Sequence, residues 1–273
     1  MRYAVIGGDM RFVHLVSMLN EAGRTAAGFL QDRANDGTSP PLKDLRNYSA
    51  IVANWPMRWP LANEGAAEEE IFSSIEPGSV LLLCGPKFPK ERRWDLQYVN
   101  LWEDEQLLQE NAYLTAEVAV DLAMHRGGRT LLHARCAVVG YGRIGRALTE
   151  ILLNMGAHVT VISRTEAKRR QAIAGGAQAM ELARIGDALE GRAFIFSTPP
   201  AGVIDGDALK RIDRDAVLMD LASPPYGFDL EEARKMGLQA CREPGLPGRY
   251  CPLSAARAVY HAVLRWEEAE QNG

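Results

Sequence analysis

Cysteine and histidine are scarce, and neither is spaced for a disulfide framework or a metal site. The four cysteines are Cys84, Cys136, Cys241 and Cys251, and no two of them form a CxxC pair. The five histidines show neither HxxxH nor HExxH spacing. Cys84 and Cys136 border apolar, strand-like runs, in which a cysteine behaves as a small hydrophobic side chain. We therefore expect free thiols and no bound metal.

Long apolar runs and blocks of basic charge are also missing. No uncharged apolar stretch approaches the roughly 18 residues that a membrane span needs. The formal net charge is −4 and no basic cluster stands out, which argues against nucleic acid as a partner. The N-terminus lacks a signal-peptide layout, because the short apolar run 3–7 leads directly into Gly8 and Asp9. We expect a cytoplasmic protein that does not associate with membranes.

The sequence has instead the alternating pattern of an α/β protein. Its 273 residues suffice for two domains, and 47% apolar and 24% charged residues are typical of globular proteins. Short apolar runs alternate with segments of helical periodicity, which predicts open α/β sheets. In a first domain, residues 1–115, we expect strands at residues 3–6, 26–30, 50–54, 80–84 and 98–101, and a helix over residues 68–75.

A second α/β domain is predicted over residues 116–253. A long helix over residues 106–125, without proline or glycine, is expected to connect the two domains. The second domain has expected strands at residues 136–139, 158–162, 193–196, 217–221 and 238–241, and helices at residues 144–155, 166–174 and 230–236. Gly156 and Gly237 stand where helix C-caps are expected.

The C-terminal tail predicts one amphipathic helix over residues 254–271, with Ser254 as its N-cap. Val259, Ala262, Val263 and Trp266 form its apolar face. We expect this helix to pack back on the first domain, and the alternative is packing on its neighbour in the chain.

A glycine-rich turn follows the first strand of the second domain. It reads Gly140-Tyr141-Gly142-Arg143-Ile144-Gly145, the GxGxxG pattern of Rossmann dinucleotide-binding domains. An apolar strand precedes the turn, and a helix and a second strand follow it, which is the context that the pattern requires. Gly140 permits the tight turn, Gly142 lets the backbone approach the pyrophosphate, and Gly145 lets helix and strand pack closely. The free N–H groups of the following helix then bind the phosphates.

The end of the second Rossmann strand favours NADP over NAD. NAD enzymes place a carboxylate there to bind the ribose 2′-hydroxyl. Here the position is occupied by Ser163, Arg164 and Thr165. The two hydroxyls can hydrogen-bond a 2′-phosphate and Arg164 can pair with it, whereas a carboxylate would repel it. Lys168 and Arg169 add positive charge nearby, although a solvated helix face is the more ordinary role for them.

Two more segments follow strands of the same predicted sheet. Thr198 and Pro199 come after one strand, and the segment with Asp220, Ala222 and Ser223 comes after the next. Ligands of open α/β sheets bind in the crevice at the carboxyl ends of the strands. We therefore expect both segments to face the cofactor.

The segment Pro244-Gly245-Leu246-Pro247-Gly248 contains two Pro-Gly pairs, which predict a rigid, tightly turning loop. With the other stretches below, it gives the sequence a resemblance to the family of dipicolinate synthase A subunits. These stretches run in the order of that family over almost the whole chain, outside residues 31–75. They are residues 4–9 with Arg11, Asn111 with residues 115–117, the turn 140–145, residues 220–224, and residues 244–248 through Pro252.

The resemblance implies a two-domain α/β fold similar to D-2-hydroxyacid dehydrogenases, with a flavodoxin-like first domain and a Rossmann second domain. It implies oxidation of a dihydrodipicolinate-type compound to dipicolinate, and the flavoprotein-like B subunit of dipicolinate synthase as partner. With the residues after the second Rossmann strand, the expected cofactor of this oxidation is NADP. The chain departs from the family pattern where Asn111 and Thr115 have no proline between them. It departs again at Arg249, Tyr250 and Cys251, where smaller apolar residues are usual.

Substrate contacts are expected mainly from the first domain. Arg11 is the candidate for binding a substrate carboxylate, with a surface ion pair as its alternative role. Asn111 and Thr115 are candidate hydrogen-bond donors, and Glu117 is a candidate base, although an ordinary helix charge is its alternative role. Backbone N–H groups of the Ser223 loop and of residues 245–248, with Arg249 or Lys87 assisting, are expected to bind another carboxylate. The expected substrate-binding residues are Gly8, Asp9, Gly245, Pro247 and Gly248.

Two other functions stay open on the sequence alone. A hydroxyacid-type NAD(P) dehydrogenase usually needs a positioned histidine. His133 and His158, the histidines near the predicted second sheet, do not follow strands, and His261 lies in the terminal helix. The second alternative is a nucleotide-binding protein that is inactive without its flavoprotein partner. An apolar terminal helix and an open sheet edge make a homodimer plausible.

Overall fold

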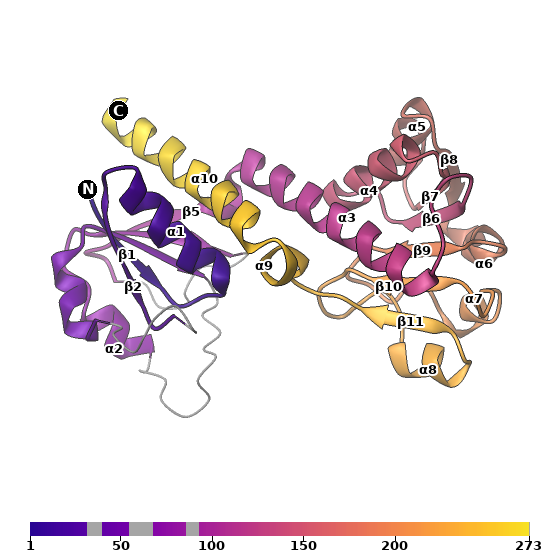
Figure 1. The fold of residues 1–273 in the computed structure, drawn as a ribbon, viewed down its shortest axis with the longest axis horizontal. Helices are drawn as coiled ribbons and strands as arrows, with labels where there is room; N and C mark the ends of the chain where they lie inside the picture. The colour runs from indigo at the N-terminus through magenta and orange to yellow at the C-terminus, as the bar shows by residue number, and fades with distance from the viewer. Residues whose placement is uncertain (32–39, 55–67, 86–92, 273) are drawn as a thin grey trace. The chain divides into compact units, whose positions relative to one another are not determined.

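The computed structural model describes residues 1–31, 40–54, 68–85 and 93–272 (Figure 1). Lys87 lies outside these residues, as do large parts of the polar stretches 31–46 and 54–66. The chain divides into two compact units. The first unit comprises Met1–Asn111 and Pro247–Gly273, and the second comprises Ala112–Leu246.

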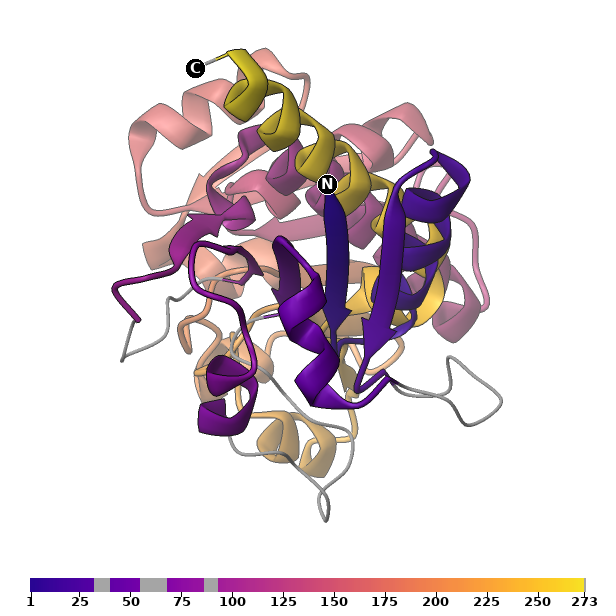
Figure 2. The ribbon, with the colours of Figure 1, turned by 90° about the vertical axis from the view of Figure 1, so that its left-hand side faces the viewer.

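The first unit contains a parallel sheet with the strand order β2-β1-β3-β4-β5. This is the flavodoxin-like order. The strand β2 lies on one side of β1 and the later strands lie on the other, so the order of strand addition reverses between β1 and β3. Figure 2 shows β1 and β2 side by side and pointing the same way. The strands are β1 (Arg2–Ile6), β2 (Thr25–Phe29), β3 (Ala50–Asn54), β4 (Val80–Cys84) and β5 (Gln97–Asn100).

Helices cover both faces of this sheet because its strands are apolar on both sides. On one face, α1 and α10 run alongside each other and share a core with Tyr3, Val5 and Leu82 (Figure 1). On the other face, α2 and η1 bury Ile71 and Leu45. The helical segments are α1 (Met10–Glu21), η1 (Leu42–Asn47), α2 (Glu68–Ser73), η2 (Leu101–Glu103), α9 (Leu246–Tyr250) and α10 (Pro252–Asn272).

The second unit contains a parallel six-stranded sheet with the order β11-β10-β9-β6-β7-β8. Numbered within the unit, this is the Rossmann order, with the reversal between β6 and β9. The predicted α/β fold class, a flavodoxin-like domain and a Rossmann domain, is therefore confirmed. The strands are β6 (Arg135–Val139), β7 (His158–Ser163), β8 (Gln178–Glu181), β9 (Phe194–Ser197), β10 (Val217–Asp220) and β11 (Gln239–Arg242).

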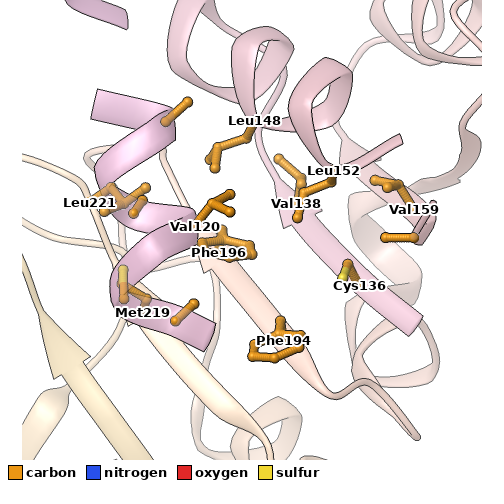
Figure 3. Packing of buried hydrophobic residues seen from close by; sticks show 14 of the residues in the cluster. Val120, Cys136, Val138, Leu148, Leu152, Val159, Phe194, Phe196, Met219 and Leu221 are labelled. Atoms are coloured by element: carbon orange, nitrogen blue, oxygen red, sulfur yellow. The ribbon is translucent and has the colours of Figure 1, made fainter. Parts of the chain in front are cut away.

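The two faces of this sheet are buried by different helices. Figure 3 shows Val120 of α3 and Leu148 and Leu152 of α4 pointing toward Val138 and Phe196 of the sheet. A separate apolar cluster under α6, α7 and α8 covers the other face. The helical segments are α3 (Glu105–Gly127), α4 (Arg143–Asn154), α5 (Glu166–Ala174), η3 (Leu182–Arg184), α6 (Ile185–Leu189), α7 (Gly206–Leu209) and α8 (Leu230–Lys235).

The structure corrects three local expectations. Strand β8 was not predicted, since two of its four residues are polar and exposed, the other two are half-buried, and together they carry little apolar signal. Residues 246–250 form the short helix α9 where a loop was predicted, because Pro247 is tolerated in a first helical turn. Helix α10 begins at Pro252, so Ser254 lies inside the helix and is not its N-cap. Gly156 and Gly237 do follow α4 and α8 with left-handed backbone, as a C-cap requires.

The described residues contain no helix long and apolar enough to cross a membrane. In the same part of the chain, no three acidic, histidine or cysteine side chains gather as metal ligands would. None of the four cysteines forms a disulfide. Burial raises the pKa of the Cys84 thiol and of the Cys136 thiol to about 12, so both stay protonated near neutral pH.

Candidate active site

The three fingerprint glycines occupy three different environments. Gly140 has a φ of +90°, and a Cβ there would lie 2.4 Å from the Oγ1 of Thr198. A Cβ on Gly145 would lie 2.3 Å from the carbonyl oxygen of Gly140. Gly142 instead faces open space, with no atom within 4 Å of its Cβ position. The first and third glycines therefore serve packing and turn geometry, and the second leaves room for a ligand to approach the backbone.

Gly142 is also the N-cap of α4, and as a glycine it has no side chain with which to cap the N–H groups of that helix end. Helix N-terminal N–H groups and the helix dipole together favour a bound anion. Arg143 and Ile144 begin the helix at this point. The open space at Gly142 and the helix N-terminus beside it fit the pyrophosphate of a dinucleotide.

A cavity of about 150 Å³ lies beside the glycine turn. Its lining combines the turn, the end of β7, the start of α5 and the loop after β9. The lining residues are Val139, Gly140, Tyr141, Ile162, Ser163, Arg164, Thr165, Lys168, Leu182, Pro199, Ala201 and Val203. Sequence reasoning missed Leu182, Ala201 and Val203, because small apolar residues in loops carry no signal until the fold brings them to the turn.

The cavity lining carries positive charge where β7 ends and α5 begins. Ser163 is buried, whereas Arg164, Thr165 and Lys168 are exposed at the end of β7 and the start of α5. The cavity lining contains no carboxylate among the described residues. Lys168, for which the sequence favoured a solvated helix face, is therefore part of the cavity wall.

Thr198 joins the two strands at the reversal point of the sheet. Its backbone N–H and its Oγ1 both donate to the carbonyl oxygen of Val139, at 3.0 and 2.9 Å. Thr198 thereby fixes the carboxyl end of β9 against that of β6, next to the start of the glycine turn. Its neighbour Pro199 lines the cavity.

Asp220 has a structural setting that the sequence did not indicate. Its side chain is 0% exposed and accepts hydrogen bonds from the N–H groups of Ala222 and Gly227, both at 3.1 Å. Arg242 lies 3.4 Å from the same carboxylate and stacks on the Tyr226 ring. The observed contacts make Asp220 the anchor of the turn that carries Ala222 and Ser223. Direct contact of these three residues with a cofactor stays a prediction.

In the first unit, Asp9 and Arg11 form one compact pair at the end of β1. Asp9 caps α1 by accepting from the backbone N–H of Arg11 at 3.1 Å. The Nε and Nη2 atoms of Arg11 also donate to the two Asp9 oxygens, each at 2.8 Å. This bidentate ion pair matches the alternative role considered for Arg11, and it leaves Nη1 outside the pair.

Glycines surround this ion pair. Gly8 has a φ of +86°, and its Cβ position is filled by the Phe12 ring. A Cβ on Gly248, in α9, would lie 2.1 Å from an Asp9 oxygen and 2.8 Å from the Nε of Arg11. The structure therefore brings Gly8, Asp9, Arg11 and Gly248 together, as candidate substrate residues of the first unit.

The remaining candidates are distributed over both units. Asn111 and Thr115 are four residues apart on α3, so they share a helix face, whereas Glu117 is exposed on another. Asn111 is the last α3 residue of the first unit, and Thr115 and Glu117 belong to the second. Gly245, with a φ of +66°, belongs to the second unit, and Pro247 to the first.

The match to a known domain family covers the glycine turn and the cavity beside it. Residues 105–223 match the NAD-binding domain of the D-isomer specific 2-hydroxyacid dehydrogenases. The Rossmann strand order, the glycine turn and this match together define an oxidoreductase of the NAD(P)-dependent dehydrogenase class, whose cofactor is a nicotinamide dinucleotide.

Comparison with individual proteins is more specific. The chain is 27% identical to the dipicolinate synthase A subunit of Bacillus subtilis (strain 168), over 97% of this chain and 95% of that protein. The crystal structure of the dipicolinate synthase A subunit from Bacillus halodurans has a TM-score of 0.82 at 23% identity, covering 97% of both chains. The apo-structure of Escherichia coli D-lactate dehydrogenase has a TM-score of 0.62 at 13% identity, covering 100% of this chain and 97% of that one. The resemblance to dipicolinate synthase A subunits is thus confirmed.

Proposed function

We propose that this protein oxidises a dihydrodipicolinate-type compound to dipicolinate with NADP, as the A subunit of a dipicolinate synthase. The observation that carries the cofactor part is the cavity wall at the end of β7, which holds Arg164 and Lys168 and no carboxylate. The observation that supports the substrate part is the similarity to a dipicolinate synthase A subunit along nearly the entire chain.

NADP is preferred over NAD because of charge at that wall. A 2′-phosphate carries up to two negative charges and accepts hydrogen bonds through three oxygens. Ser163 and Thr165 offer hydroxyl groups, and Arg164 and Lys168 offer positive charge, to a phosphate at the β7 end of the cavity. An NAD ribose would leave these cations without a partner.

The substrate proposed is a partly reduced pyridine with two carboxylates. When bound, NADP supplies the hydride acceptor. The protein's part is to position the ring and to accept the proton that leaves, since aromatisation itself favours the reaction. Arg11 binds one carboxylate, with Asp9 fixing its guanidinium from one side. Asn111 and Thr115 supply neutral hydrogen bonds. Glu117, exposed on another face of α3, is the candidate base, with an ordinary helix charge as its alternative role.

Turnover by the purified protein tests this function. We expect the protein with NADP and enzymatically generated dihydrodipicolinate to give the ultraviolet absorbance of the aromatic product. Product that forms only after the flavoprotein-like B subunit is added would establish the alternative, a nucleotide-binding protein that needs its partner. Oxidation of a 2-hydroxy acid instead would replace the substrate class. We further propose that the protein acts in the cytoplasm as a homodimer that works with the B subunit.

Replacing Arg11 with alanine tests the carboxylate contact. We expect kcat/KM for the substrate to fall about 10- to 100-fold, which corresponds to the loss of one hydrogen-bonded charge pair. The Kd for NADP should stay within about twofold of wild type, since Arg11 is assigned to the substrate. Arg2→Ala, at the opposite end of β1, is the matched control and should leave both values unchanged. Unaltered turnover by Arg11→Ala would remove Arg11 from the mechanism.

A further inference from the structure

Arg169 lies in the first turn of α5, beside the cofactor cavity but not in its lining. Its side chain turns back toward the end of β7. The Nη1 atom donates to the carbonyl oxygen of Ser163 at 2.9 Å and to that of Arg164 at 3.0 Å. One nitrogen is thus shared by two successive carbonyl groups of the segment that lines the cavity.

These two bonds act where the sheet no longer orders the chain. Ser163 is the last residue of β7 that pairs with β8, so the carbonyl of Arg164 lies beyond the strand ladder. Thr165, the N-cap of α5, makes no side-chain capping bond that would hold the turn. Arg169 fixes the peptide groups of Ser163 and Arg164, and with them the directions in which the side chains of residues 163–165 leave the backbone.

The charge of this turn has no partner within the described protein. Arg170 pairs with Glu166 at 2.5 Å, on the exposed side of α5. Arg164, Lys168 and Arg169 make no ion pair with any described residue, although a cation at a helix N-terminus opposes the helix dipole. Three cations at such a helix end favour an anionic ligand that offsets both effects.

We infer that Arg169 is a positioning residue that sets the preference for NADP, by holding the Ser163–Thr165 turn in the conformation that receives the 2′-phosphate. This inference rests on the proposed NADP dependence. Because Arg169 acts through the backbone of the turn, it affects the end of the dinucleotide that distinguishes NADP from NAD. The pyrophosphate contacts at Gly142 are left as they are.

Binding titrations of NADP and NAD with the full-length protein test the inference. We expect Arg169→Ala to weaken NADP binding about tenfold and NAD binding less than about threefold. Arg170→Ala is the matched control, since it removes the same charge from the same helix without touching the turn. It should change both affinities by less than about twofold. Arg169→Lys, which keeps a donor for the two carbonyl groups, should restore most of the preference.

Each contrary outcome has a separate meaning. Equal weakening of NADP and NAD by Arg169→Ala would show a general structural role and overturn the inference. Equal weakening of NADP binding by Arg169→Ala and Arg170→Ala would show an effect of bulk charge, and would overturn it too. A wild-type protein that binds NAD as tightly as NADP would contradict the proposed cofactor itself, before any variant is compared. Melting temperatures of the unliganded variants identify a variant that is not folded. If Arg169→Ala does not fold, the NADP and NAD affinities of Arg169→Lys are compared with those of wild type instead.

Discussion

Gly145→Ala is expected to abolish dinucleotide binding and to destabilise the second unit at the same time. The new Cβ would lie 2.3 Å from the backbone carbonyl oxygen of Gly140, so the glycine turn and α4 have to separate. Forcing an extra carbon into a packed site costs about 1–3 kcal/mol of unfolding free energy. We expect the Kd for NADP to rise at least about 100-fold, because the phosphate-binding N–H groups move with the helix. Isothermal titration and thermal unfolding measure the two effects.

Gly142→Ala separates the two effects. Its Cβ position has no atom within 4 Å, and its φ of −87° suits any residue. The unfolding free energy should stay within about 0.5 kcal/mol of wild type. Binding of NADP should nevertheless weaken about tenfold or more, since the methyl group occupies the space through which the pyrophosphate approaches the backbone. Unchanged NADP binding by Gly142→Ala would place the pyrophosphate elsewhere, and a large loss of stability would contradict the open environment of this glycine.

Glu267→Ala is expected to cause the largest loss of stability in the first unit. The carboxylate of Glu267 is buried at 7% exposure between two partners from the start of the chain. The Tyr3 hydroxyl donates to it at 2.9 Å, and Arg24 Nη2 donates to it at 2.5 Å. Removing one member of a buried pair leaves the others unsatisfied and costs about 3–5 kcal/mol. Urea unfolding measures the loss, and Glu268→Ala, at the exposed neighbouring position, should change stability by less than about 0.5 kcal/mol.

The contribution of Glu267 should depend on pH with a defined sign. Burial alone would raise the pKa of this carboxyl, but hydrogen bonds from Arg24 and Tyr3 outweigh burial and hold the pKa below its ordinary 4.5. A lowered folded pKa means that the stabilisation is complete above the unfolded pKa and is lost as pH falls through the folded pKa. The stability difference between wild type and Glu267→Gln should therefore shrink as the pH falls below the ordinary carboxyl pKa of 4.5. A difference that grows on acidification would contradict the assigned pKa direction.

Much of the fold can be predicted from the sequence, because apolar strand runs and helix-ending glycines are set by residues close together in the chain. Apolar runs such as 80–84 and 136–139 correspond to strands buried on both faces, and Gly156 and Gly237 follow helices with the left-handed backbone that glycine favours. The expected strands lie within one or two residues of the observed ones. Strand β8 was not predicted because its exposed and half-buried residues lack an apolar pattern. Helix α9 was missed because two Pro-Gly pairs in five residues predict a turn.

The candidate cofactor site also has features that the sequence predicts and features that only the fold reveals. The sequence by itself determined the GxGxxG turn and the replacement of a carboxylate by Ser163, Arg164 and Thr165, since both depend on neighbours along the chain. Only the tertiary structure decided that Arg169 holds two carbonyl groups of that segment, because side-chain direction at a helix start depends on what packs there.

The candidate substrate residues show the limit of sequence reasoning more strongly. Arg11 was identified as a cation after β1, but its pairing with Asp9 and the close approach of Gly248 required the fold. Asp220 was assigned to the crevice by its place after a strand, and tertiary packing then buried its carboxylate among backbone N–H groups and Arg242. Sequence order determines which residues reach the carboxyl edge of a sheet. Packing decides which of them keep their polar atoms exposed, since a buried charge is stable only where partners from distant segments surround it.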